Sequence, residues 1–296
     1  MSHSSEHDAR SPNASSDKGD ATPDYADRIL KGGSSVFSGS LVAKAVGFAL
    51  QVVLGRGFGK TLYGLYSYGL SVLRIVRELS TLGLQNGVVR FGAEHNEDGN
   101  KAALKGTFLA VGGLGTGAGV LMGVALYLAA PWLAEVALRS TNDPLVFQLF
   151  GIALPFYVFT YLGSRMARAL GQMRVDVLLD SILQPALFLL FTGIILLLGQ
   201  GFRMALYAFV ASTVLAAGAS AYAVYRLFPP LFSSLVPTID LRTLLRFSLP
   251  IVGVSLASMG LARADRIMLG PLAGEEAVGL YTAASKMSVQ LRFVLF

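Results

Sequence analysis

The chain has 296 residues, of which 53% are hydrophobic and only 14% are charged, and its formal net charge is +6. Soluble domains carry roughly 25% charged residues, so this composition indicates a protein of the lipid bilayer. The basic residues are dispersed among apolar segments and form no run interleaved with aromatics, which argues against binding of nucleic acid. Because the chain has no cysteine and only three histidines, disulfides are excluded, and we expect no metal site and no cofactor.

The first segment of the chain, residues 1–30, is rich in Ser, Asp, Asn and Pro and has no apolar run. Such a composition cannot bury enough apolar surface to fold, so we expect a disordered tail. It does not have the pattern of a signal peptide, because the first apolar segment begins only near Ser34 and no small-residue cleavage site follows it.

Eight apolar segments follow, and each is predicted to be a membrane-spanning helix. Gly106 to Ala130, for example, contains no charged residue, and this exceeds the ~20 residues that cross about 30 Å of hydrocarbon. The sequence therefore predicts an all-α polytopic membrane protein. The eight segments are 34–54, 62–84, 106–130, 145–164, 177–199, 204–225, 244–270 and 277–296.

The basic residues of the short connections predict the orientation. Every second connection is rich in Lys and Arg, and such connections remain in the cytoplasm. Nine basic residues then lie on the side of the N-terminus, and four lie on the other side. We expect a multi-pass protein of the cytoplasmic membrane with a cytoplasmic N-terminus. The nine are Arg90, Lys101, Lys105, Arg165, Arg168, Arg174, Arg226, Arg242 and Arg246; the four are Arg56, Lys60, Arg139 and Arg203.

An internal repeat predicts how the helices are organised. Leu54-Gly55, Gly59 and Gly64-Leu65-Tyr66 recur as Leu269-Gly270, Gly274 and Gly279-Leu280-Tyr281, with an offset of 215 residues. Six segments separate the copies, so the two repeats have the same orientation across the membrane. We therefore expect a two-lobe transporter fold. Its predicted parts are a disordered cytoplasmic tail (1–30), a complete first six-helix lobe (31–228), a cytoplasmic connection (229–243) and the first two helices of a second lobe (244–296), so we expect the chain to be incomplete as a transporter.

Polar residues within the predicted spans point to a binding cavity. In segments 34–54 and 62–84 they recur every three or four residues and form one polar face on each helix. A central Lys or Arg costs about 3 kcal/mol in a bilayer, so these side chains must pair with acids or line a water-filled cavity. Basic groups outnumber acids there, which favours a cationic cavity for a phosphate or carboxylate. The candidate cavity residues are Lys44, Arg74, Arg77, Glu78, Arg263, Asp265, Arg266, Lys286 and Arg292.

Other interpretations of these charges remain open. Arg77 and Glu78 lie toward the inner end of their segment, from which they can reach the membrane surface. Asp265 and Arg266 can form a structural pair at a helix end. Asp176 and Asp180 are four residues apart near the predicted inner end of segment 177–199. They are typical of an interfacial charge cluster, and a proton relay is the alternative.

Three stretches of the sequence resemble a known family. They are Leu84-Gln85-Asn86-Gly87-Val88-Val89-Arg90-Phe91, Arg246-Phe247-Ser248-Leu249-Pro250, and Ala264-Asp265-Arg266-Ile267-Met268-Leu269-Gly270 with Val278-Gly279-Leu280-Tyr281. They resemble the polysaccharide biosynthesis and oligosaccharide flippase proteins of the multidrug/oligosaccharidyl-lipid/polysaccharide (MOP) exporter superfamily. The resemblance implies two six-helix lobes and a central cavity that opens alternately to each side. It also implies polyprenyl-phosphate or pyrophosphate-linked glycans as cargo, with or without a coupling ion.

The leading functional hypothesis is therefore export, or flipping, of lipid-linked oligosaccharide or polysaccharide precursors through the cationic cavity. A cation-coupled drug or metabolite exporter of the same superfamily is the alternative, and it would require an acidic site deep in the first lobe. A membrane-embedded glycosyltransferase or polymerase is disfavoured, because the short connections leave no room for a catalytic domain. The sequence therefore predicts a transporter and not an enzyme.

Overall fold

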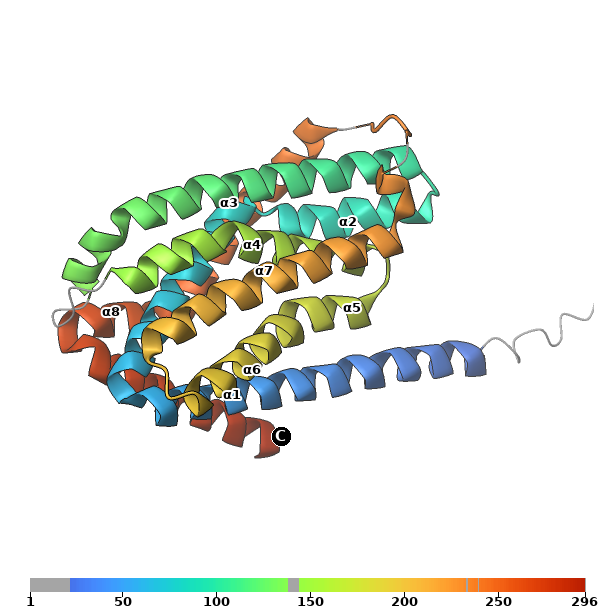
Figure 1. Ribbon diagram of the computed structural model, residues 1–296. Coiled ribbons are helices and arrows are strands. Elements are labelled where there is room, and N and C mark those ends of the chain that lie inside the picture. Colours follow the sequence, from blue (N-terminus) through green and yellow to red (C-terminus); the bar gives the residue numbers. More distant parts are fainter. Residues whose placement is uncertain (1–21, 138–143, 233, 239, 296) are drawn as a thin grey trace, which may run out of the picture.

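The computed structural model describes residues 22–137, 144–232, 234–238 and 240–295. Within these residues the secondary structure is entirely helical, and the helices pack side by side in an elongated bundle (Figure 1). The elements are α1 (Thr22–Thr81), α2 (Leu84–Glu97), α3 (Lys101–Ala137), α4 (Leu145–Ala169), α5 (Met173–Val177), the π-helix η1 (Leu178–Leu183), α6 (Gln184–Leu197), α7 (Phe202–Leu227), the 3₁₀-helix η2 (Pro229–Phe232) and α8 (Leu241–Leu295).

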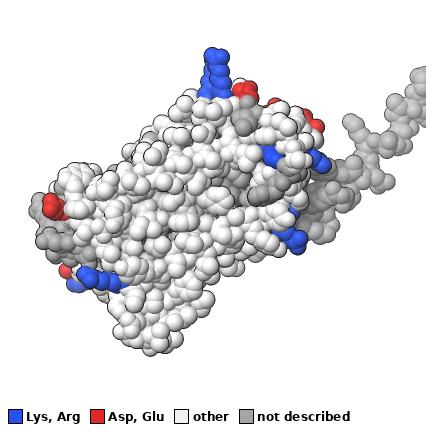
Figure 2. All heavy atoms as spheres, turned by 45° about the horizontal axis from the view of Figure 1, so that its top comes forward, with Lys and Arg blue, Asp and Glu red and all other residues white. Residues whose placement is uncertain are grey.

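Five helical stretches within the described residues are long and apolar enough to cross a membrane. They are Ser38–Thr81, Lys101–Glu135, Leu145–Ala169, Met173–Leu197 and Phe202–Leu227. On the face shown in Figure 2, charged side chains gather toward the two ends of the bundle, and a broad uncharged surface lies between them. The prediction of an all-α, multi-pass membrane protein is confirmed.

Two glycines divide the longest helices. Gly59 in α1 has φ 82° and ψ 170°, and Gly274 in α8 has φ 81° and ψ 176°. A side chain would clash with the backbone at such angles, so only glycine adopts them readily. Each kink separates two of the predicted spans. The two glycines are 215 positions apart, and the sequence repeat is therefore also a repeat of backbone geometry.

The repeated segments pack against each other. A Cβ added at Gly279 would lie 2.3 Å from the carbonyl oxygen of Lys60 and 3.3 Å from Cα of Gly64, the equivalent glycine of the first copy. The ammonium of Lys60 also pairs with a carboxylate oxygen of Glu276 at 2.5 Å. We call this end of the bundle the kink end, and we call the other, where residues 228–240 join α7 to α8, the linker end.

The predicted boundaries differ from the structure in two places. Helix α1 begins at Thr22, so residues 22–30 of the expected tail are helical; Pro23 and Asp24 suit a first helical turn. Residues 1–21 lie outside the described part of the chain. Helix α4 extends to Ala169 and includes Arg165 and Arg168, which were expected in a connection. Their guanidinium groups bind acids of the next helical segment, which allows the helix to continue.

The glycines of α3 form a packing seam with α4. Added Cβ atoms at Gly115 and Gly119 would lie 2.3 Å from Leu162 and 3.2 Å from Val158, and one at Gly123 would lie 2.6 Å from the carbonyl of Gly151. Small residues at this spacing let membrane helices approach closely. Gly113 and Gly117, equally well spaced in the sequence, face open space.

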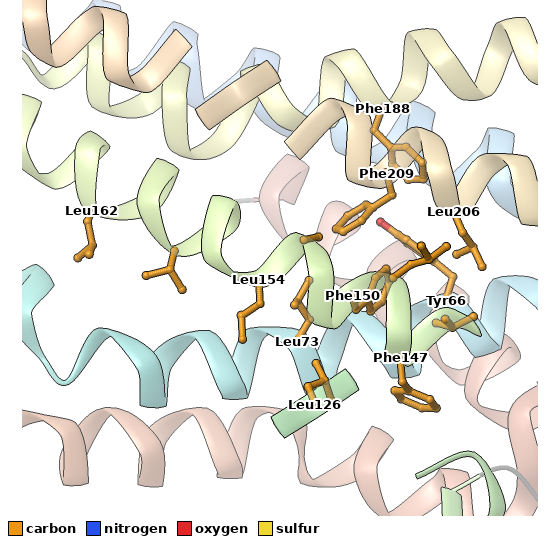
Figure 3. Packing of buried hydrophobic residues seen from close by; sticks show 14 of the residues in the cluster. Tyr66, Leu73, Leu126, Phe147, Phe150, Leu154, Leu162, Phe188, Leu206 and Phe209 are labelled. Carbon is orange, nitrogen blue, oxygen red and sulfur yellow. The ribbon is translucent and has the colours of Figure 1, made fainter. Parts of the chain in front are cut away.

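Aromatic side chains fill the bundle toward the kink end, and we call them the aromatic core. It comprises Tyr66, Phe150, Phe188 and Phe209, from α1, α4, α6 and α7 (Figure 3). The ring of Phe209 lies 4.8 Å from that of Phe150 and 5.4 Å from that of Phe188. Such tilted and edge-to-face contacts are the favoured arrangement of aromatic pairs, and they fix α7 against α4 and α6.

Candidate functional site

The polar face predicted for segment 62–84 is buried in the part of α1 that follows the kink. Ser67, Ser71, Glu78 and Thr81 are all at most 7% exposed. Two of the three hydroxyls are satisfied within the helix, because Ser71 donates to the carbonyl of Ser67 at 2.9 Å and Thr81 donates to that of Glu78 at 2.8 Å. The longer side chains of this face extend to other helices and form the candidate site.

Arg74 and Arg77 contact tyrosines of α4. Arg74 lies beside Tyr157, and the carboxylate of Asp180 also interacts with it electrostatically. The guanidinium carbon of Arg77 lies 4.0 Å from the ring centre of Tyr161 and 5.1 Å from that of Tyr157. A guanidinium above an aromatic face is stabilised by the ring quadrupole without being neutralised. Both arginines are thus held in place with their charge intact.

The next turns of α4 carry two further arginines, which bind carboxylates after the α4–α5 turn. Arg165 pairs with Asp180 at 2.6 Å and with Asp176 at 3.3 Å. Arg168 donates from Nε to Oδ2 of Asp176 at 2.7 Å, and its Nη2 also contacts this oxygen. Asp176 is only 1% exposed, so its charge is offset by two guanidinium groups rather than by water.

A local distortion places Asp180. It lies in the π-helix η1, between α5 and α6. Pro185 follows at the start of α6 and has no N–H to donate to Ser181, so the regular α-helical pattern cannot continue through this turn. A π turn adds one residue per turn and changes the direction of the side chains within it. In this geometry the Asp180 carboxylate reaches Arg165.

We call these side chains the polar cluster: Arg74, Arg77, Glu78, Gln85, Tyr157, Tyr161, Arg165, Arg168, Asp176 and Asp180. Tyr161 joins the arginines of α1 to those of α4, because its ring contacts Arg77 and also lies 4.7 Å from the guanidinium carbon of Arg165. Glu78 accepts a hydrogen bond from the amide of Gln85 at 2.7 Å. Among the residues that the structure describes, the ion pairs of this cluster within 4.0 Å use Arg165 and Arg168 and do not include Arg74 or Arg77.

Four atoms of the cluster, two donors and two acceptors, have unused hydrogen-bonding capacity; the acceptors are Oε1 of Gln85 and Oδ1 of Asp176. Nε of Arg77 and Nε of Arg165 are buried, and no described residue accepts a hydrogen bond from either. Buried polar atoms without partners are uncommon, and a bound water, ion or ligand group is one way to satisfy them. The cluster therefore has positive charge and free donors on the faces of α1 and α4 that meet at Tyr161.

Only some of the predicted site residues lie in the polar cluster. It brings Arg74, Arg77 and Glu78 into one cluster. Lys44 is exposed on the first part of α1, and Asp265 is half-buried on α8; both take part in further polar interactions. The side chains of Arg263, Arg266, Lys286 and Arg292 lie outside the described part of the chain.

The sequence interpretation did not include the α4 residues of the cluster among the site residues. Tyr157, Tyr161, Arg165 and Arg168 follow one another at steps of four, four and three, which places them on one helix face. This spacing is the signal that would have identified them. Asp176 and Asp180, which the sequence left as an interfacial charge cluster or a proton relay, are paired with basic residues.

A cavity of about 390 Å³ lies at the linker end, between α2, α3 and the start of α8. Its polar lining includes Glu94, His95, Thr107 and Asp240. Within the described residues, no group of three or more His, Asp or Glu side chains is arranged to hold a metal ion.

Residues 29–296 match the sequence model of a family described as polysaccharide biosynthesis protein. A comparison with curated proteins gives no match. In fold, the chain is similar to the MATE multidrug transporter DinF-BH, whose structure was solved as a complex, with a TM-score of 0.66 and 14% identity over 91% of this chain and 61% of that one. A second solved structure, described as protein A, gives a TM-score of 0.64 and 13% identity over 92% and 62%. The chain thus spans less than two thirds of the length of either protein.

Proposed function

Because this chain belongs to the polysaccharide biosynthesis protein family, as its sequence motifs predicted, we propose that the complete protein exports lipid-linked saccharides. In this proposal it moves oligosaccharide or polysaccharide precursors across the cytoplasmic membrane by alternating access. It performs no covalent chemistry on them. Its fold, shared with a MATE transporter of the same superfamily, is suited to this role.

The observation that carries the proposal is the state of Arg74 and Arg77. Both lie in a stretch long and apolar enough to span the membrane; within the described residues their direct partners are tyrosines, and Asp180 acts on Arg74 without forming an ion pair within 4.0 Å. A partly buried cation with no direct ion pair is costly in a bilayer, so its retention favours an anionic ligand. A phosphate or pyrophosphate, as in a polyprenyl-linked glycan, accepts several guanidinium hydrogen bonds at once.

The alternative is a cation-coupled exporter of drugs or metabolites. It is the weaker candidate, because such coupling needs a carboxylate that can exchange a proton or bind a cation. Asp176 and Asp180 are already paired with Arg165, and Glu78 is hydrogen-bonded to Gln85. A cation would have to displace a guanidinium from Asp176 or Asp180 to bind there.

We further propose that the linker end faces the cytoplasm, as the distribution of basic residues predicted, and that residues 31–228 form the first of two lobes. The absence of cysteine makes the orientation simple to test. In intact cells, a membrane-impermeant maleimide should label Arg203→Cys at the kink end and should not label His95→Cys at the linker end. The reverse pattern would contradict the orientation.

The transport proposal is tested with the complete protein in proteoliposomes that carry a fluorescent polyprenyl-pyrophosphate saccharide. We expect Arg74→Ala and Arg77→Ala each to slow translocation by about tenfold or more, since each removes a charged hydrogen-bonding group. Arg203→Ala, which removes an exposed arginine outside the cluster, serves as the matched control. Unchanged rates in both variants would exclude a role for the cationic cluster.

A genetic experiment separates the two transport hypotheses. If the proposal is correct, deletion of the gene causes a lipid-linked saccharide to accumulate on the cytoplasmic side of the membrane. If surface glycans remain intact and only sensitivity to a drug changes, the alternative exporter is favoured.

A further inference from the structure

A cavity of about 350 Å³ lies between α1 and α8, close to the kink end. It is separate from the polar cluster, and its walls come from both copies of the internal repeat. Helix α1 contributes Phe48, Gln51, Val52, Gly55, Arg56, Lys60 and Tyr63, and α8 contributes Gly279, Leu280 and Ala283.

The kinks and the helix contact explain why there is space at this point. Gly64 and Gly279 bring α1 and α8 into backbone contact, where even a Cβ would not fit. The ion pair between Lys60 and Glu276 joins α1 and α8 close to the same point. Gly59 interrupts α1 between the lining residues Arg56 and Lys60, and the cavity lies beside this kink, between α1 and α8.

The lining of the cavity is amphipathic. Phe48, Val52, Leu280 and Ala283 supply an apolar wall, and the side chains of Phe48 and Leu280 are 42% and 57% exposed. Arg56 and Lys60 supply the charge at the end that is nearer the kink. A ligand for such a lining has an anionic head and an apolar chain.

The described charges match a ligand with one negative charge. Lys60 pairs with the single carboxylate of Glu276, and 59% of its side chain remains exposed. Arg56 adds a second positive charge to the rim of the cavity. Two cations and one anion leave one positive charge in excess.

We propose that this cavity binds an anionic glycerophospholipid of the leaflet at the kink end. Its phosphate lies between Arg56 and Lys60, and one acyl chain lies along Phe48, Val52 and Leu280. Charge-assisted hydrogen bonds from guanidinium and ammonium groups to phosphate are among the stronger ones in proteins. The apolar wall distinguishes the site from one for free phosphate. The bound lipid touches both copies of the repeat and therefore stabilises their contact at Gly64 and Gly279.

The test measures how much phosphatidylglycerol the complete protein retains in native mass spectrometry after purification in detergent. We expect Arg56→Gln combined with Lys60→Gln to reduce retention about tenfold, through loss of charge-assisted contacts. Ala283→Trp should have a similar effect because it fills the apolar part and changes no charge. Glu276→Gln should raise retention, because it frees Lys60. Arg203→Gln, which also removes a basic residue at the kink end, should leave retention unchanged.

Equal retention by the wild type and the double variant would overturn the proposal. Displacement of phosphatidylglycerol by glycerol phosphate would also overturn it, because the site would then be one for free phosphate. Displacement by the polyprenyl-linked saccharide would assign the cavity to the exported lipid instead. Since the readout is retention of lipid and not transport, failure here leaves the proposed function untouched, and failure of transport leaves this site untouched.

Discussion

The aromatic core and the polar cluster are built largely on the same helices, yet they have opposite chemistry. Tyr66 in the core and Arg74 in the cluster are eight residues apart on α1, a rise of about 12 Å along the helix. Phe150 and Tyr157 are separated in a similar way on α4. Within this short distance the contacts between helices change from ring against ring to arginine against tyrosine and carboxylate.

The difference shows what each region contributes. Aromatic contacts such as that between Phe150 and Phe209 stabilise the bundle through close packing. A buried ion network is a poor source of stability, because desolvation of the charges offsets much of their attraction. Apolar side chains of similar size would stabilise the cluster at least as well. We infer that the cluster is retained for ligand binding and that the core is retained for stability.

The largest effect is expected when the polar cluster is broken from within. Asp176→Asn removes the buried carboxylate that Arg165 and Arg168 share, and the largely buried guanidinium of Arg165 then keeps only Asp180 as a carboxylate partner. Breaking a buried ion pair on one side costs about 3–5 kcal/mol. The unfolding free energy in mixed micelles, followed by denaturant titration, should fall by that amount.

The same experiment can be sharpened with a paired replacement. Asp176→Leu combined with Arg168→Leu should be less destabilising than Asp176→Asn alone, because one guanidinium is removed together with its partner. If the double variant is less stable than Asp176→Asn, the ion pairs of the polar cluster contribute more to stability than we infer from comparing the cluster with the aromatic core.

A slightly smaller effect is expected in the aromatic core. Phe209→Ala removes a ring that contacts Phe150 and Phe188 and leaves a cavity. Such changes cost about 3–5 kcal/mol in soluble proteins. We expect the lower end of this range, since lipid solvates the exposed ring in the unfolded reference state. Phe209→Leu should recover most of the loss in the same unfolding measurement. Transport by the folded fraction should be unchanged, in contrast to Arg77→Ala.

The glycine seam beside the aromatic core gives a third test. Gly123→Leu places a side chain where a Cβ alone would lie 2.6 Å from the carbonyl of Gly151, so α3 and α4 must separate. Overpacking of this kind costs about 1–3 kcal/mol. Gly117→Leu, on the open face of the same helix, is the matched control and should leave the unfolding midpoint nearly unchanged.

The smallest effect concerns an exposed charge outside both regions. Asp240 precedes α8, and hydrogen bonds from Thr243, including its backbone N–H at 3.0 Å, hold the pKa of this carboxyl below its usual value. The ionised form is therefore favoured in the folded state. This contribution is present above the unfolded pKa of about 3.9 and is lost as the pH falls through the lower folded value.

Comparison of the unfolding midpoint at about pH 5 and about pH 3 should therefore show a smaller pH-dependent loss in Asp240→Asn than in the wild type, because asparagine still caps the helix but does not titrate. An identical loss in both proteins would show that the capping bond does not contribute.

Much of the fold was predictable because a bilayer imposes it. Long uncharged runs such as 106–130 must form helices, since hydrocarbon offers no other partner for the backbone. The glycines at 59 and 274 were recognisable as a repeat from spacing alone, and the structure gives them the same φ and ψ. The burial of Ser67, Ser71 and Thr81 likewise follows from a polar face on a membrane helix.

The partners of the buried charges were not predictable in the same way. Periodicity places Arg74 and Arg77 on one face of α1. It does not show that these arginines contact tyrosines of α4, or that the arginines of α4 pair with Asp176 and Asp180. That arrangement depends on the rotation of each helix and on the π turn before Pro185, and both are set by packing between segments distant in the sequence. The sequence by itself determined which segments are helical and which faces are polar. Tertiary structure alone decided which charges are neutralised, because pairing depends on distances between helices.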